Sequence, residues 1–158
     1  MRKLLFVLAA LAGTFATQAQ ETKFGVKAGV DLASTKVDLG PLGEVTGSET
    51  GYYLGGFASI GISEKFAVQP ELMYVLIKDF NFLSVPILAK YELADSFHLM
   101  AGPSLNYFTE LEEEKFKINV DFGASYDISE EFDVNAKYSL GTGDVAISGI
   151  FIGAGYKF

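Results

Sequence analysis

Residues 116–141 show the clearest alternation of apolar and polar side chains in the chain. Alternate positions at the start of this segment are apolar or aromatic: Phe116, Ile118, Val120, Phe122, Ala124 and Tyr126. The positions between them are small, polar or charged: Lys117, Asn119, Asp121, Gly123, Ser125 and Asp127. Successive side chains of a β-strand point to opposite faces, so the pattern predicts a strand with one apolar and one polar face. The pattern resumes at Phe132 after a polar turn, which predicts a β-hairpin.

The same alternation recurs along the chain and predicts an all-β protein. The predicted strands cover residues 23–33, 51–62, 66–77, 82–92, 97–108, 116–127, 132–141 and 147–158. Most have about the ten residues that a tilted strand needs to cross a bilayer. Pro70 lacks a backbone donor, which predicts a bulge or a locally broken ladder in its strand.

The connections between these strands differ at the two ends of the predicted sheet. Three short polar turns, at residues 63–65, 94–96 and 128–131, are each followed by a phenylalanine that opens the next strand. At the other end, residues 34–50 are predicted to form the longest loop, and residues 110–115 an acidic one. Short turns at one end, longer loops at the other and an even strand number are typical of an outer-membrane β-barrel. Both termini then lie at the short-turn end, which we expect to be periplasmic.

Alternation alone does not say whether the apolar rows face lipid or a protein core. A soluble eight-stranded ligand-binding barrel would place them inside. Here aromatic side chains gather at the two ends of the apolar rows, as they do where amphipathic rings lie at lipid headgroup level. We therefore predict an eight-stranded antiparallel up-and-down transmembrane barrel. Its predicted lipid-interface aromatics are Phe66, Tyr74, Tyr91, Phe97, Tyr107, Phe116, Tyr126, Phe132, Tyr138, Tyr156 and Phe158.

The opposite rows are rich in glycine, serine, asparagine and charged residues, which suits the crowded interior of a small barrel. An unpaired charge in such a lumen would cost several kcal/mol, so we expect the enclosed charges to pair. The predicted lumen charge network consists of Lys27, Asp31, Glu71, Lys90, Glu92, Asp121, Asp133, Lys137 and Lys157. This network predicts a salt-bridged, mostly closed lumen.

The N-terminus has the pattern of an export signal. Arg2 and Lys3 precede the apolar residues 4–12, and small residues stand at Thr17 and Ala19. This arrangement is typical of a secretory signal peptide, here residues 1–19, followed by a barrel domain at residues 20–158. The chain has no cysteine and a formal net charge of −8. Because no basic stripe is present, we expect no nucleic-acid partner.

Several segments also resemble a known family. Residues 68–74 (Val-Gln-Pro-Glu-Leu-Met-Tyr), residues 83–91 (Leu-Ser-Val-Pro-Ile-Leu-Ala-Lys-Tyr), residues 101–103 (Ala-Gly-Pro) and the C-terminal Tyr156-Lys157-Phe158 are similar to the small outer-membrane "porin family" β-barrels of Gram-negative bacteria. The resemblance implies an eight-stranded barrel in the outer-membrane bilayer. It also implies insertion by the barrel-assembly machinery, whose recognition signal resembles Gly153-x-x-Tyr156-x-Phe158, although Phe151 stands where a polar residue is usual. The family implies no catalytic residues and no cofactor.

Candidate chemistry outside the lumen network is sparse. Residues 141–146 (Gly-Thr-Gly-Asp-Val-Ala) have the glycine spacing of a dinucleotide fingerprint, but a strand and not a helix follows. His98 is the sole histidine, and we interpret it as a hydrogen-bonding lumen residue and not as a metal ligand. The glutamates of residues 110–114 could hold a divalent cation, or simply form a solvated acidic loop.

These features favour a non-enzymatic outer-membrane barrel with a structural or interaction role. A partner outside the cell would then be contacted through residues 34–50 and 110–115. The alternative is a narrow porin-like channel for small solutes or ions. Its path would run along the same lumen charges.

Overall fold

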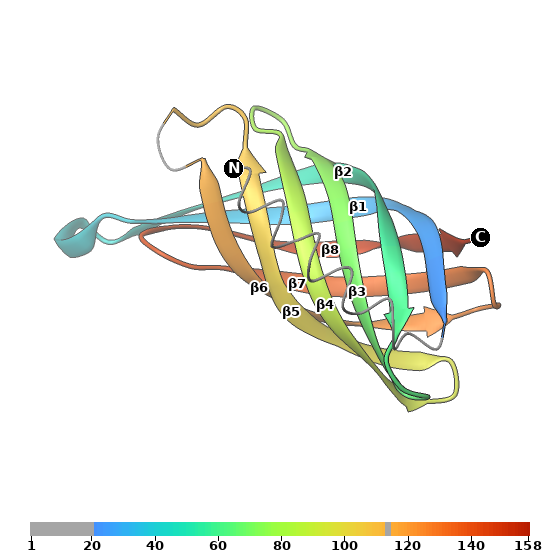
Figure 1. Ribbon diagram of the computed structural model, residues 1–158. Coiled ribbons are helices and arrows are strands. Elements are labelled where there is room, and N and C mark those ends of the chain that lie inside the picture. Colours follow the sequence, from blue (N-terminus) through green and yellow to red (C-terminus); the bar gives the residue numbers. More distant parts are fainter. Residues whose placement is uncertain (1–20, 113–114) are drawn as a thin grey trace, which may run out of the picture.

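The computed structural model describes residues 21–112 and 115–158, so the predicted signal peptide, residues 1–19, lies outside the described residues. Eight antiparallel strands form one closed barrel, in which each strand pairs with its neighbours in sequence and β1 pairs with β8 (Figure 1). The strands are β1 (Thr22–Asp38), β2 (Glu44–Gly61), β3 (Phe66–Leu76), β4 (Phe82–Ala94), β5 (Phe97–Phe108), β6 (Phe116–Asp127), β7 (Phe132–Gly141) and β8 (Val145–Lys157). No helix in the described residues is long and apolar enough to span a membrane. The predicted eight-stranded all-β barrel is confirmed.

The apolar rows face outward and the polar rows face the lumen. On β6, Val120 is 49% exposed, whereas the neighbouring Asp121 is 1% exposed. The same contrast separates Leu99 of β5, which is exposed, from Lys90 of the adjacent strand β4, which is buried. An exposed row of leucine, valine and phenylalanine is stable where hydrocarbon surrounds it, and a soluble ligand-binding barrel would show the reverse arrangement.

Both ends of the described chain lie beside the short turns. The backbone N–H of Gly61, at the end of β2, donates to the carbonyl of Glu21, and the N–H of Lys157 donates to the carbonyl of Glu131. Residues 62–65, 95–96 and 128–131 connect the strand pairs at this end, which we call the turn end. The opposite end, which carries residues 39–43, 77–81, 109–112, 115 and 142–144, is the loop end.

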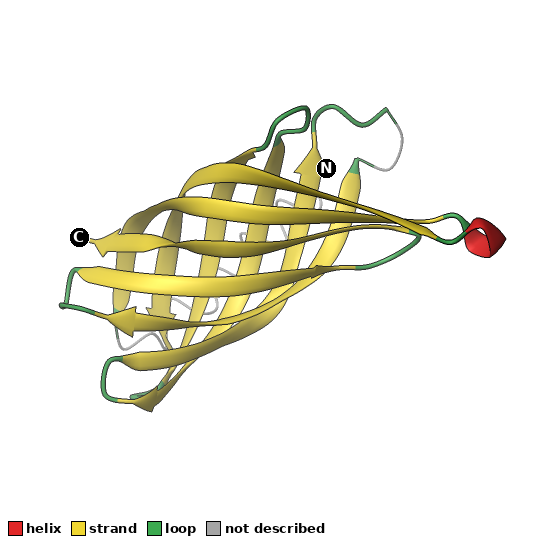
Figure 2. Cartoon of the chain, turned by 180° about the vertical axis from the view of Figure 1, so that it is seen from behind, coloured by secondary structure: helices red, strands yellow, loops and turns green. Residues whose placement is uncertain are grey.

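Residues 34–50 differ from the prediction, because most of them are strand and not loop. β1 runs to Asp38 and β2 begins at Glu44, and only residues 39–43 connect them, with a short 3-10 helix, η1 (Gly40–Leu42), at the tip. The pairing of β2 with β3 stops at Tyr52 and Leu76, whereas β8 accompanies β1 as far as Val145. Residues 34–50 therefore form a protruding hairpin that extends beyond β3, and β8 accompanies its β1 strand as far as Val37 (Figure 2).

Three strands carry a proline, and each proline lies at or beside a gap in a ladder. Between β2 and β3 the pairing is interrupted opposite Gln69 and Pro70, and it resumes at Val68 in the same register. Pro86 of β4 and Pro103 of β5 lie at comparable gaps in the next two ladders. A missing backbone donor removes ladder hydrogen bonds. The locally broken ladder predicted at Pro70 is present, without a shift of register.

Apolar side chains fill the lumen toward the loop end, a layer that the alternation of the sequence did not predict. The buried members of this apolar layer are Ala33, Tyr53, Met73, Val75, Ile77, Phe82, Phe108 and Phe151. Phe80, Leu111 and Ile147 pack against it from the loop end. Phe82 and Phe108 lie with ring centroids 4.7 Å apart, and Tyr53 meets Phe151 edge to face at 5.5 Å. The interior is thus polar in its middle and apolar near the loops.

Candidate functional site

The centre of the lumen is organised around Glu71, an inward residue of β3 that is 2% exposed. Lys27 Nζ of β1 donates a 2.8 Å hydrogen bond to Glu71 Oε1. Gln69 Nε2 donates to the same oxygen at 2.7 Å, and Lys137 Nζ of β7 lies 3.7 Å from Glu71 Oε2. One carboxylate therefore connects strands from opposite parts of the chain.

Lys137 extends this arrangement to β6. Its Nζ lies 2.8 Å from Asp121 Oδ2, and Ser104 Oγ of β5 donates to Asp121 Oδ1 at 2.7 Å. The ammonium also lies 5.0 Å from the centre of the Phe151 ring, at the boundary with the apolar layer. We call Lys27, Glu71, Asp121 and Lys137 the central ion cluster. Every member is almost completely buried, so its charges are screened little by water or salt.

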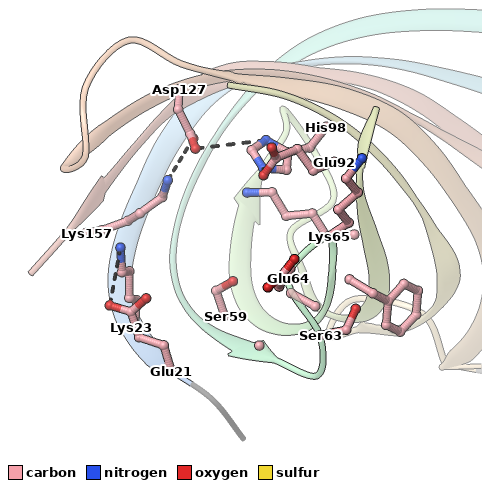
Figure 3. Close-up of a pocket in the computed structure, with 14 residues that line it drawn as sticks. Glu21, Lys23, Ser59, Ser63, Glu64, Lys65, Glu92, His98, Asp127 and Lys157 are labelled. Carbon is pink, nitrogen blue, oxygen red and sulfur yellow. Dashed lines mark hydrogen bonds and ion pairs between the residues drawn. The ribbon is translucent and has the colours of Figure 1, made fainter. Parts of the chain in front are cut away.

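A second group of charges lies at the turn end. Lys157 Nζ donates to Asp127 Oδ1 at 2.7 Å and lies 3.8 Å from Asp133 Oδ2. His98 lies between two acids: its Nε2 is 3.7 Å from Glu92 Oε2, and its Nδ1 is 3.9 Å from Asp127 Oδ2 (Figure 3). Alternation had placed Asp127 on the inward row of its strand, but the predicted network omitted it.

These charges border a cavity of about 300 Å³ at the turn end, which we call the vestibule. Its charged lining residues are Glu21, Lys23, Glu64, Lys65, Lys90, Glu92, His98, Asp127 and Lys157. Toward the loop end the lumen is much tighter. A cavity lined by Asp31, Asn106, Asn119 and Phe151, among others, has a volume of only about 10 Å³, the space of about one water molecule.

All nine predicted lumen charges point inward, but they do not all pair as expected. Within the described residues, Asp31 and Lys90 form no ion pair, and Glu92 is paired with His98 and not with a lysine. Asp31 Oδ1 has no hydrogen-bond partner among the described residues. The physical cause is the stagger of the strands, which places Lys137 nearer Asp121 and Glu71 than Asp31.

The predicted interface aromatics all occupy outward positions. Several meet across neighbouring strands: ring centroids lie 4.9 Å apart for Tyr107 and Phe116, and 4.9 Å apart for Phe132 and Tyr156. Phe66 faces Tyr91 in the register of β3 and β4. Cross-strand aromatic pairs stabilise a sheet, and these rings also form the outer surface that a bilayer would contact.

The comparison with protein families identifies this architecture. The family described as outer membrane protein beta-barrel domain matches residues 5–158. The chain belongs to this family. It is therefore an outer-membrane β-barrel protein of Gram-negative bacteria, as the resemblance in sequence implied. A search of curated proteins found no match.

Several solved β-barrels have the same fold as this chain, although their sequence identity to it is low. Ail, the attachment invasion locus protein of Yersinia pestis, is 16% identical with a TM-score of 0.60, over 88% of this chain and 100% of that chain. Neisserial surface protein A is 19% identical with a TM-score of 0.59, over 88% and 100% of the two chains. Ail has also been solved in complex with the heparin analogue sucrose octasulfate. At these identities the likeness shows the fold alone.

Proposed function

We propose that this protein is a non-enzymatic outer-membrane barrel with a closed lumen, whose role is to present its loop end to a partner outside the cell. The observation that carries the proposal is the central ion cluster, which ties β1, β3, β6 and β7 together across the lumen. The apolar layer lies beyond it toward the loop end. The described lumen residues therefore form a plug.

The energetics of the central ion cluster favour closure. Water or an ion could pass only if Lys27 left Glu71 or Lys137 left Asp121, two contacts of 2.8 Å between buried groups. Breaking a buried ion pair costs about 3–5 kcal/mol, because it leaves an uncompensated charge. A path would also have to separate the rings of Phe82 and Phe108.

A narrow channel is the alternative, and one observation favours it. The vestibule admits solvent-sized molecules from the turn end and is lined by charges of both signs, including Lys65 and Glu64 at its rim. A channel would have to continue past Glu71 through the central ion cluster. The vestibule supplies only the first part of such a path.

The protruding hairpin is the surface that best fits an external contact. Its tip is apolar and exposed: Leu42 is 86% exposed, and Leu39 and Val45 are also exposed. Lys36 is its only basic residue, against three acids, and the predicted acidic loop 110–115 adds four glutamates and one lysine; residues 113–114 of that loop lie outside the described residues. A surface with this charge favours a partner with apolar or basic contacts over a sulfated polyanion such as the one bound by Ail.

This role requires the turn end to face the periplasm. Short turns and chain termini lie at the periplasmic side of outer-membrane barrels, and export through the periplasm would follow from the predicted signal peptide. Tyr156 lies on the outward row of β8, and Phe158 directly after the strand is 73% exposed, so the barrel-assembly machinery could reach both. Protease added to intact cells should then cut the protruding hairpin and leave residues 128–131 intact.

Conductance measurements test closure directly. We expect the purified barrel in a planar bilayer to show no reproducible current steps. As a matched positive control, Glu71→Ala combined with Lys137→Ala removes the centre of the plug while leaving the outward rows unchanged, and it should introduce small steps. Steps in the unmodified protein that disappear on Glu71→Gln would overturn the closed barrel in favour of the channel.

A further inference from the structure

Lys90 is a buried lysine for which the described part of the chain supplies no ionic partner. It lies on the inward row of β4 and is 6% exposed. Within the described residues, no carboxylate forms an ion pair with its ammonium group and no acceptor forms a hydrogen bond with it. The other three predicted lumen lysines, Lys27, Lys137 and Lys157, each meet at least one acid. A buried ammonium without a counter-ion is costly, so this position calls for an anion.

Three of the four acids that line the vestibule, Glu21, Glu92 and Asp127, are already engaged by other groups, and the fourth, Glu64, forms no ion pair with Lys90 within the described residues. Asp127 accepts from Lys157 at 2.7 Å, and Glu92 lies 3.7 Å from His98 (Figure 3). At the rim, Glu21 lies 3.5 Å from Lys23. Asp133, deeper in the lumen, accepts from Asn135 at 2.9 Å. None of these carboxylates therefore neutralises Lys90 through a direct contact.

We propose that the vestibule binds a small soluble carboxylate, with Lys90 as the residue that contacts it. Lys90 lines the vestibule, so its ammonium can donate charge-assisted hydrogen bonds to a carboxylate that enters from the turn end. Ser59 and Ser63 line the same cavity and offer hydroxyl donors. The volume of about 300 Å³ accommodates a molecule of amino-acid size.

The charge of the lining selects a weakly charged ligand. Lys23, Lys65, Lys90 and Lys157 face the cavity together with Glu21, Glu64, Glu92 and Asp127. This balance of four lysines and four acids gives the lining no net charge, so it offers no net attraction to a polyanion and favours a molecule with a single negative charge or a zwitterion. A lipid headgroup is disfavoured, because Lys90 points into the lumen and the barrel wall separates it from the bilayer.

Nuclear magnetic resonance of the full mature barrel in detergent micelles tests the proposal. Lysine labelled at its ε-carbon gives a signal for Lys90, assigned by its loss in Lys90→Gln and, as a second variant, Lys90→Met. Sodium acetate should shift this signal in a saturable manner, whereas sodium chloride at equal ionic strength should not. Lys78→Gln, at the loop end, is the matched control and should leave the titration unchanged.

A second readout follows the unfolding temperature. Acetate should raise the unfolding temperature of the unmodified barrel and of Lys78→Gln, and it should have no effect on Lys90→Met. Without acetate, Lys90→Met should unfold at a higher temperature than the unmodified barrel, because it removes an unpaired buried charge. Equal responses of the Lys90 signal to acetate and chloride, or an acetate effect that persists in Lys90→Met, would overturn the proposal. Neither outcome depends on whether the lumen conducts.

Discussion

Lys137 has the most demanding environment of the central ion cluster, because it serves two acids from one position. It lies 2.8 Å from Asp121 and 3.7 Å from Glu71, and all three side chains are almost fully buried. In a low-dielectric lumen such contacts are strong, but each charge also loses its hydration. Removing one charge therefore has a larger effect than removing a complementary pair.

Substitution of Lys137 by methionine should destabilise the barrel by about 3–5 kcal/mol, because Asp121 is left buried without a cation. Reversible guanidinium unfolding in lipid vesicles measures this difference. Lys36→Met is the matched control: Lys36 and Glu44 lie 3.7 Å apart on the protruding hairpin with about 60% of each side chain exposed. This exposed pair should contribute less than about 1 kcal/mol.

A double variant distinguishes charge from packing. Adding Asp121→Asn to Lys137→Met removes both charges of the pair and should recover part of the lost stability. The ionic interpretation of this contact would fail if the effects were additive. In that case Asp121→Asn would lower the free energy of unfolding of Lys137→Met by as much as it lowers that of the unmodified barrel.

Gly102 marks a point where the wall leaves no room for a side chain. A Cβ added there would collide with the carbonyl oxygen of Ile87 on the adjacent strand. Gly102→Ala should therefore lower stability by about 1–3 kcal/mol or impair folding, which the same unfolding experiment detects. Gly47→Ala is the matched control, because a Cβ at Gly47 meets nothing within 4 Å, and it should change stability by less than about 0.5 kcal/mol.

At the scale of elements, the protruding hairpin is joined to the rest of the barrel only through β8, which pairs with its β1 strand from Ser34 to Val37. Its strands pair with each other up to Val37 and Val45, beyond the point where β3 stops pairing with β2. Its side chains are exposed from Glu44 to Thr50, so little apolar burial depends on them. The ladder of hydrogen bonds and not a hydrophobic face holds its register.

Replacing residues 36–46 by an Asn-Gly turn should therefore leave a folded barrel. We expect the shortened protein to keep the heat-dependent electrophoretic mobility of the full chain and to lose the external protease site. A matched deletion in the wall, such as residues 120–121 with their partners 139–140, should abolish folding because it shortens β6 and β7 and changes the depth of their inward residues relative to the neighbouring strands. Loss of the folded form in the hairpin variant would show that the hairpin is part of the folding unit.

At the scale of the whole molecule, closure of the sheet pairs each of the eight strands with two neighbours. The pairing of β1 with β8 leaves no free edge in the barrel wall. In lipid or detergent every backbone polar group needs such a partner, so partial opening is costly and the barrel unfolds as a unit. The ion pairs that connect β1, β3, β6 and β7 inside the lumen make this unfolding more cooperative.

Electrophoresis of unheated and heated detergent extracts tests this property. The unheated protein should migrate as a compact species, and boiling should convert all of it to a form of different mobility, without intermediate bands. Identical mobility before and after boiling would contradict a detergent-resistant closed barrel.

Several features of the fold were predictable from local pattern. The bounds predicted for residues 97–108, 116–127 and 132–141 agree with β5, β6 and β7, because alternating strands that begin at a phenylalanine after a short turn have clear ends. Residues 34–50 were predicted wrongly as loop. The β2 strand of that hairpin is exposed on both faces from Glu44 to Thr50, so it shows no alternation, and Gly40-Pro41 at the tip is a turn signal only for residues 39–43.

The sequence predicted which charged residues line the lumen, but not which of them form ion pairs with one another. Inward position follows from period two, which identified Lys90 and Glu71 as lumen residues. The apolar layer was missed because Phe82 and Phe108 stand at strand ends, where an inward aromatic resembles an interfacial one. Period two gives the face of a residue and not its depth along the barrel.

The sequence alone determined the number of strands and the side of the wall on which each side chain lies, because hydrocarbon outside and a crowded lumen inside act on each strand separately. Only the tertiary structure decided which lumen charges meet. Lys27 and Glu71 are 44 residues apart, and their 2.8 Å contact depends on the stagger of strands that are not adjacent. The same stagger leaves Lys90 facing the vestibule without an ionic partner among residues 21–112 and 115–158, since closure of the barrel sets the relative depth of all eight strands at once.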